Sequence, residues 1–344
     1  MIVGPPVVSN PPHAAQRRVT RRALLSASAA LLAGCAAMPR VAAERGHPPT
    51  LDGAFVMSDG VALPMRAWLP AGEPNAVVLA LHGFNDSRDA FELSAPDFAA
   101  IGIAFYAPDQ RGFGEAAVRG VWAGADQMAA DAQAMAELLV RLHPGSKLFL
   151  LGESMGGAVL MRLAATRQVA GVAGYVMASP AVWGREQMDL FLRTGLWVVS
   201  HAAPGYSVRD GGPVTVRASD NIAALRRLSR DPLTLHDTRL RTLRGLVDLM
   251  DDALAAAPAF TAPGLFLYGG HDELVPKPAM RAAWRMLGRH RRVRLAYYPN
   301  SYHLLLRDHG RAAPINDILG WMRDPAGTLL SGADRRAADW MAHA

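Results

Sequence analysis

The chain has 344 residues and a formal net charge of +6 at pH 7, from 36 lysines and arginines against 30 aspartates and glutamates. Four of the arginines precede the lone cysteine, Cys35, so a chain cleaved there keeps 32 basic and 30 acidic side chains, a net of +2, which excludes nucleic acid as a partner. A single cysteine excludes an intrachain disulfide, and no zinc-type spacing, Walker loop or dinucleotide fingerprint is present, so we expect no cofactor and no metal.

The N-terminal residues are typical of an export signal. Arg21 and Arg22 precede an apolar run that ends at Leu32-Ala33-Gly34-Cys35 and is too short to span a bilayer. The arginine pair resembles a twin-arginine signal, and the last four residues resemble a bacterial lipobox, in which Cys35 becomes the lipid-modified first residue. We expect residues 1–34 to be removed and 35–50 to form a linker. The acyl chains would then hold the protein at a membrane of the bacterial cell envelope, on the periplasmic side. The alternative is a cytoplasmic protein that starts at Met38.

Between residues 51 and 325, apolar runs of strand length alternate with segments of helical periodicity. Strands are expected at 63–69, 76–81, 102–107, 147–151, 171–178, 264–268 and 293–298, and helices at 126–142, 279–287 and 315–322. Nearly continuous apolar strands that alternate with helices predict an α/β fold with a mostly parallel sheet, covered on both faces. The core is assigned to residues 51–180 and 262–325, and residues 326–344 to a C-terminal tail.

The loop after strand 76–81 reads His82-Gly83-Phe84. Gly83 permits a tight turn that would leave the backbone amide of Phe84 pointing inward, where it could bind a developing oxyanion. The alternative is that the two residues before Phe84 merely end the strand.

The pentapeptide Gly152-Glu153-Ser154-Met155-Gly156 stands between an apolar strand and a helix start, the context of a nucleophile elbow. A serine on such a sharp turn has strained backbone angles, and the two glycines let neighbouring segments pass close to it. Ser154 is therefore the candidate nucleophile. The amides at the start of the following helix point at the same place, so the amides of Met155 and Phe84 are the candidate oxyanion hole.

Residues 181–261 interrupt the alternation of strands and helices. They hold an apolar stretch at 190–199 and amphipathic material at 222–254, and an insertion at this point would lie over the active-site edge. We expect a helical cap or lid, and its apolar face is a second candidate for membrane contact. The alternative is that these residues pack onto the sheet. The arginine clusters within them are interpreted as solvated helix faces.

An acid and a base follow the last two strands. Asp272 comes after strand 264–268 and His303 comes after strand 293–298, and open α/β sheets place catalytic groups just past strand ends. Asp272 is the candidate acid and His303 the candidate base. Glu273 as the acid, and His271 or His309 as the base, remain alternatives.

Taken together, five motifs resemble the monoacylglycerol lipase and lysophospholipase branch of the α/β-hydrolase superfamily, also grouped with serine aminopeptidases, over roughly residues 52–325. They are His82-Gly83-Phe84, Asp109-Gln110-Arg111-Gly112-Phe113-Gly114, Gly152-Glu153-Ser154-Met155-Gly156-Gly157, Gly270-His271-Asp272 and Ser301-Tyr302-His303. The resemblance implies the α/β-hydrolase fold and a helical cap before the strand that carries the acid. It also implies Ser154 as nucleophile, Asp272 as acid and His303 as base, with oxyanion amides at Phe84 and Met155. Phe113 and Glu153 stand where the family often has histidine, and neither position is expected to carry the chemistry.

The sequence thus predicts an exported, lipid-anchored serine hydrolase whose partner is a small lipidic ester, a monoacylglycerol or a lysophospholipid. An aminopeptidase of the same fold is an alternative. It would need an acidic cluster in the cap to hold a free amine, and Asp248, Asp251 and Asp252 are the candidates. A non-catalytic lipid-binding lipoprotein is the other alternative. Oligomeric state is not predicted.

Overall fold

The computed structural model describes residues 50–51, 53–209 and 216–343. The export signal, Cys35 and most of the expected linker therefore lie outside the described residues. Within the described residues, no helix combines the length and the apolar character needed to cross a membrane.

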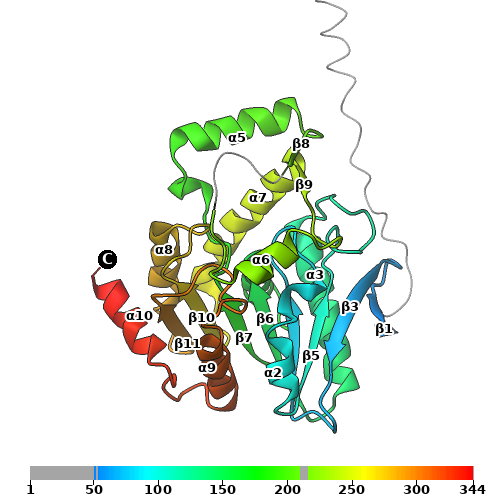
Figure 1. Cartoon of the computed structure of the whole chain (residues 1–344), viewed down its shortest axis with the longest axis vertical. Coiled ribbons are helices and arrows are strands. Elements are labelled where there is room, and N and C mark those ends of the chain that lie inside the picture. The colour runs from blue at the N-terminus through cyan, green and yellow to red at the C-terminus, as the bar shows by residue number, and fades with distance from the viewer. Residues whose placement is uncertain (1–49, 52, 210–215, 344) are drawn as a thin grey trace, which may run out of the picture. The chain divides into compact units, whose positions relative to one another are not determined.

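In the described part of the chain, a nine-stranded sheet has the order β1-β2-β3-β5-β4-β6-β7-β10-β11 (Figure 1). Its strands are β1 (Thr50–Leu51), β2 (Ala54–Val56), β3 (Ala62–Trp68), β4 (Ala76–Leu81), β5 (Ile103–Pro108), β6 (Lys147–Glu153), β7 (Val172–Ala178), β10 (Gly264–Gly269) and β11 (Val293–Tyr298). The first four strands in this order pair antiparallel, and all pairs from β5 to β11 are parallel. The predicted α/β fold with a mostly parallel sheet is confirmed.

Helices cover both faces of this sheet, as predicted. Alternate residues of each strand point to opposite faces, so each face has apolar side chains for helices to pack against. On one face, α3 (Ala125–Leu142), α4 (Met155–Thr166), α7 (Leu240–Ala256) and α8 (Lys277–Leu287) pack against residues such as Val77 and Leu79 of β4. On the other face, α2 (Ala95–Ala99) and α9 (Ala312–Arg323) pack against residues such as Val78 and Ala80. Because these strands pair parallel, one edge of the sheet holds the carboxyl ends of β4, β6, β7, β10 and β11.

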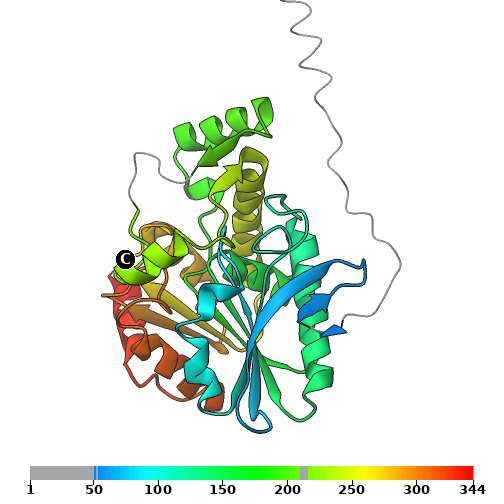
Figure 2. The ribbon, with the colours of Figure 1, turned by 45° about the vertical axis from the view of Figure 1, so that its right-hand side comes forward.

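The segment between β7 and β10 carries η2 (Arg185–Gln187), α5 (Leu190–Ala202), β8 (Ser207–Arg209), α6 (Ile222–Leu228), β9 (Asp237–Arg239), α7 and η3 (Ala257–Ala259). Its two long helices differ in burial. Helix α7 places Leu249 and Ala253 in the main core, and a Cβ on Gly245 would collide with Trp122. Helix α5 lies beyond α7 in both views, and Leu190 and Phe191 at its start are exposed (Figures 1 and 2).

The C-terminal residues 326–344 include α10 (Ala333–Ala342), which packs on the last strand of the sheet. Its Trp340 stacks on Tyr297 of β11, with ring centroids 4.8 Å apart and planes 10° from parallel, and the guanidinium of Arg281 lies 4.4 Å from the centroid of the same indole. Ala333 and Ala337 are buried. Helix α10 therefore covers the sheet at β11, the last strand in the sheet order.

Candidate active site

Ser154 lies at the junction of β6 and α4, as the N-cap residue of that helix, with φ 51° and ψ −112°. A positive φ at a residue other than glycine costs on the order of 1–3 kcal/mol and persists only where the surroundings enforce it. Here the Ser154 amide donates to the carbonyl oxygen of Ala178 at 2.9 Å, and its own carbonyl accepts from the amides of Ala158 and Ala181. The edge of β7 therefore fixes the turn that presents this hydroxyl.

The two glycines of the pentapeptide are required by close backbone approaches. A Cβ on Gly152 would lie 2.5 Å from the backbone of Gly156 and Gly157, and a Cβ on Gly156 would collide with the carbonyl oxygen of Leu81. Real Cβ atoms essentially never approach this closely. The spacing therefore serves the steric purpose that the sequence predicts.

His303 and Asp272 form a buried pair in the loops after β11 and β10. Nδ1 of His303 lies 2.8 Å from Oδ2 of Asp272. The other carboxylate oxygen accepts the amides of Leu274 and Val275 at 2.8 and 2.9 Å. Because the Asp272 carboxylate is the acceptor in all three hydrogen bonds, the imidazole proton must be on Nδ1 of His303. Nε2 is therefore the nitrogen that can take a proton.

Two glycines at the end of β10 keep these loops in contact. A Cβ on Gly269 would collide with the carbonyl oxygens of Ser301 and Tyr302, and one on Gly270 would collide with that of Pro299. The loop that carries the acid thus runs directly against the loop that carries the imidazole.

Opposing effects act on the His303 imidazole. Burial disfavours the imidazolium, but the charge of Asp272, the hydrogen bond to it and the charges of Glu153 and Asp308 outweigh burial, so the pKa of His303 is raised. One of the charges that act on this imidazole is therefore that of Glu153, the residue before Ser154. Among the described residues, no hydrogen bond joins Ser154 Oγ to His303.

The alternative acid and bases occupy different surroundings. Glu273 is exposed, and its carboxylate accepts the amide of Arg217. His271 is exposed and packs edge-on against the ring of Tyr302, and His309 is exposed. The buried carboxylate–imidazole pair therefore singles out Asp272 and His303.

The loop after β4 lies directly beside Ser154. A Cβ on Gly83 would be 3.5 Å from the Cβ of Ser154, which is ordinary van der Waals contact. The left-handed residue of this loop is Asn85, with φ 62°, and Gly83 does not have a positive φ. In the described part of the chain, the amides of Phe84 and Met155 donate to no acceptor, so both are available to an oxyanion.

His82 orients the Phe84 amide, a role that the sequence analysis missed. The Gln110 amide donates to Nε2 of His82 at 3.0 Å, so the proton resides on Nδ1, which donates to the carbonyl of Gly83 at 2.8 Å. Burial lowers the pKa of His82, which keeps the ring neutral. The Gly83 carbonyl and the Phe84 amide belong to one trans peptide and point in opposite directions, so this hydrogen bond aims the amide away from the ring.

Arg307 was also missed, and it connects its own loop after β11 to the segment after β4 and to the end of β6. Its guanidinium bonds to the carboxylate of Asp86 in the Phe84 loop and to the carbonyl of Ala90, and lies 3.8 Å from Glu153 beside Ser154. Arg307 itself follows His303 by four residues. Its place four residues after the candidate base is a sequence signal, but its partner Asp86 is remote in sequence.

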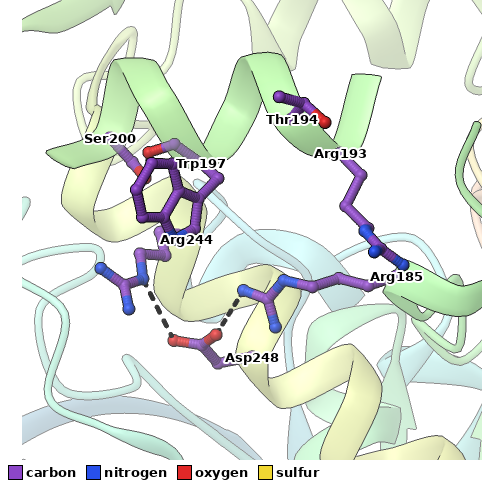
Figure 3. Close-up of a pocket in the computed structure, with 7 residues that line it drawn as sticks. All are labelled: Arg185, Arg193, Thr194, Trp197, Ser200, Arg244 and Asp248. Carbon is purple, nitrogen blue, oxygen red and sulfur yellow. Dashed lines mark hydrogen bonds and ion pairs between the residues drawn. The ribbon is translucent and has the colours of Figure 1, made fainter. Parts of the chain in front are cut away.

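A pocket of about 380 Å³ separates α5 from α7 and contains none of these residues (Figure 3). It is lined by Arg185, Arg193, Thr194, Trp197, Ser200, Arg244 and Asp248. Asp248 accepts from Arg185 and lies 4.0 Å from Arg244, as the dashed lines in Figure 3 show. Charged groups therefore face this pocket, and the ion pair of Arg185 with Asp248 joins η2 to α7 there.

Comparison with known proteins identifies a family and several relatives. A family model described as serine aminopeptidase, S33, matches residues 72–310. The monoacylglycerol lipase of Mycolicibacterium smegmatis is 26% identical over 270 residues, 78% of this chain and 95% of that protein. The monoglyceride lipase of Homo sapiens is 27% identical over 259 residues, 74% of this chain and 84% of that protein.

Solved structures show the same fold. The crystal structure of Paleococcus ferrophilus monoacylglycerol lipase matches with a TM-score of 0.63 at 24% identity, over 76% of this chain and 98% of that chain. A soluble variant of monoglyceride lipase from Saccharomyces cerevisiae, in complex with a substrate analog, matches with a TM-score of 0.66 at 17% identity, over 83% of this chain and 99% of that chain.

Proposed function

The chain belongs to the serine aminopeptidase S33 family, and on this premise we propose that it is a serine hydrolase that cleaves carboxylic esters of lipidic alcohols through an acyl-enzyme on Ser154. Monoacylglycerols or lysophospholipids are the proposed substrate class, since curated relatives are named monoacylglycerol or monoglyceride lipases. The observation that carries the proposal is the buried pair of His303 and Asp272 at the sheet edge where the strained Ser154 lies.

In the proposed reaction, Nε2 of His303 takes the hydroxyl proton while Ser154 Oγ bonds to the ester carbonyl carbon. The carbonyl oxygen becomes an oxyanion held by the amides of Phe84 and Met155. The carbon–oxygen bond to the alcohol then breaks, and the imidazolium gives its proton to the departing oxygen. Water, deprotonated by the same imidazole, then bonds to the acyl carbon, the bond to Ser154 Oγ breaks to release the acid, and the imidazolium returns its proton to Oγ. Asp272 stabilises the imidazolium in both halves.

The aminopeptidase alternative receives little support from the cap. Its three candidate aspartates are already paired: Asp248 and Asp251 with Arg185, and Asp252 with Arg162 Nη1 at 3.0 Å. A free substrate amine would have to displace these arginines, so ester hydrolysis is the better match.

We further propose that α5 serves as the lid that contacts lipid. Exposed apolar residues on it include Leu190, Phe191, Val198 and Val199, whereas Trp197 lines the pocket beneath it, which is also bordered by charged groups. A helix with an unburied apolar face and polar packing behind it is suited to meet acyl chains.

Export and lipid anchoring through Cys35 remain proposals from sequence. Bacteria grown with an alkynyl fatty acid should label the wild-type protein, and Cys35→Ser should abolish the label and release the protein from the membrane fraction. Equal labelling of both forms would reject Cys35 as the acylation site.

Two measurements test the enzymatic proposal. A fluorophosphonate probe should label the wild type and not Ser154→Ala, and labelling that persists in the variant would reject the nucleophile. Hydrolysis of a p-nitrophenyl ester series but not of prolyl anilides would distinguish an esterase from an aminopeptidase. Failure to hydrolyse any short acyl ester would favour the non-catalytic alternative.

A further inference from the structure

Glu153, the residue before Ser154, has a buried carboxylate that the proposed mechanism does not use. It continues the alternation of β6 after Phe149 and Leu151, whose side chains lie on the sheet face covered by α2 and α9. Its exposure is 0%, and neither carboxylate oxygen has a hydrogen-bond partner in the described chain. Burying a carboxylate without hydrogen bonds is costly, and an apolar side chain at the same place would avoid the cost.

Charged groups face Glu153 from the loops on either side. One of them is Arg307, whose Nη2 lies 3.8 Å from Oε1, within range of charge attraction but beyond hydrogen-bond distance. That guanidinium is mainly engaged by Asp86 from the loop after β4. The charges of Asp86, and of His303 and Asp308 in the loop after β11, also act on the Glu153 carboxyl.

The neighbouring strand contributes no further charge. β7 is followed by Ser179, whose buried hydroxyl oxygen also lacks a hydrogen-bond partner among the described residues. Burial raises the pKa of Glu153 to about 7, and the charge of Arg307 only partly opposes this effect. The carboxylate therefore changes charge in the range where a histidine does.

We propose that Glu153 is a positioning residue that acts through His303, so that its own ionisation sets the protonation equilibrium of the imidazole. This inference rests on the proposed hydrolase function, because it concerns the base of that reaction. An ionised Glu153 stabilises the imidazolium, and a protonated Glu153 releases the neutral imidazole that acts as base. The charges of the two groups interact, so they titrate as a coupled pair and the acid limb of the pH profile is broad.

Glu153→Gln tests the proposal, because it removes the charge and keeps the shape. The His303 ring is followed by NMR titration, and kcat/KM for a soluble ester is measured over the same pH range. The midpoint of His303 should fall by about half a pH unit or more, a threefold change in the ratio of imidazole to imidazolium. The acid limb should move to lower pH and narrow to a single ionisation.

Glu273→Gln is the matched control, since it makes the same chemical change at an exposed residue next to Asp272. It should leave the His303 midpoint unchanged. Glu153→Met is the second variant, because the native carboxylate has no hydrogen bond to lose, and it should shift His303 in the same direction as Glu153→Gln.

A role of Glu153 in packing alone would lower activity at every pH without moving the midpoint. Unchanged His303 midpoints in both Glu153 variants would overturn the proposal. The NMR titration does not require turnover. If the wild type hydrolyses no ester but the His303 midpoint still falls in the Glu153 variants, the hydrolase function is rejected and the coupling of Glu153 to His303 is supported.

Discussion

Nδ1 of His303 lies 2.8 Å from Oδ2 of Asp272, with side-chain exposures of 4% and 0%. The remaining oxygen of Asp272 accepts two backbone amides, so the carboxylate cannot turn away from the ring. Because solvent is excluded and the acceptor is fixed, the ring has one favoured tautomer and one favoured orientation. The geometry thus distinguishes the two nitrogens: Nδ1 is held by the carboxylate, and Nε2 is the nitrogen that can take a proton.

Asp272→Asn should lower kcat by about 10³- to 10⁴-fold with little change in KM, because the amide group can hold the wrong imidazole tautomer. Initial rates on a p-nitrophenyl ester measure this. Glu273→Gln is the control and should retain nearly full activity. The reverse result, with Glu273→Gln inactive and Asp272→Asn active, would transfer the role of acid to Glu273.

The raised pKa of His303 predicts where the enzyme loses activity in acid. Only the neutral imidazole can act as base, and it gains a proton as pH falls through the folded-state pKa. The acid limb of kcat/KM should therefore have its midpoint above the ordinary histidine value of about 6.5. The stability of the fold depends on pH in the opposite direction to activity. The stabilisation that protonated His303 contributes is complete below its unfolded-state pKa and is lost as pH rises through its folded-state pKa. A limb centred well below 6.5 would contradict the assigned surroundings of His303.

His82→Ala should lower kcat and leave KM nearly unchanged, because it frees the Gly83 carbonyl and with it the peptide that presents the Phe84 amide. Loss of a whole oxyanion donor costs about 10²- to 10³-fold in kcat, and a donor that is only misoriented should cost about 10- to 100-fold. His309→Ala, at an exposed position, is the matched control. Thermal melting of both variants separates a local effect from unfolding, and a folded His82→Ala protein with wild-type kcat would contradict the role.

Gly156→Ala should destabilise the fold by more than about 3 kcal/mol, because the new methyl group meets the carbonyl oxygen of Leu81 and the backbone there cannot yield. Gly320→Ala in α9 is the control. Its Cβ would point into open space, and the better helix propensity of alanine should stabilise the protein by about 0.5–1 kcal/mol. Chemical denaturation measures both, and equal stabilities would refute the close approach.

Strand positions could be predicted where an apolar run has clear boundaries. β4 begins and ends at the predicted residues 76–81, because all of its residues are buried and form a continuous apolar run. β11 also begins and ends at the predicted residues 293–298, although it is only partly buried, because Pro299 follows its last residue. β1 and β2 were not predicted, since two or three residues carry no periodic signal. Helix α10 was not predicted either, because its burial depends on Trp340 meeting Tyr297, a contact that its own sequence does not encode.

The candidate site likewise contains residues that could be predicted from the sequence and residues that could not. Ser154, Asp272 and His303 could be placed from local signals, because each follows a strand end. The buried charges behind them could not, because Arg307 and Asp86 are 221 positions apart and meet only through the order of the strands. Glu153 shows the limit most clearly: the sequence predicts no chemical role for it, whereas its burial and lack of hydrogen bonds appear only in three dimensions.

Substituting the exposed apolar residues of α5 tests whether this helix meets lipid. Phe191 is 89% exposed, and burying such a side chain in an acyl layer stabilises the complex by about 1.5–3 kcal/mol, roughly tenfold or more in affinity. Phe191→Ser should therefore lower the rate on monoacylglycerol in vesicles about tenfold and leave the rate on a soluble short-chain ester unchanged. Leu330→Ser is the matched control, because Leu330 is 82% exposed and lies outside the 181–261 segment. Equal losses in the two variants would mean that exposure alone matters, and a loss on the soluble ester would mean that α5 shapes the site itself and does not deliver lipid to it.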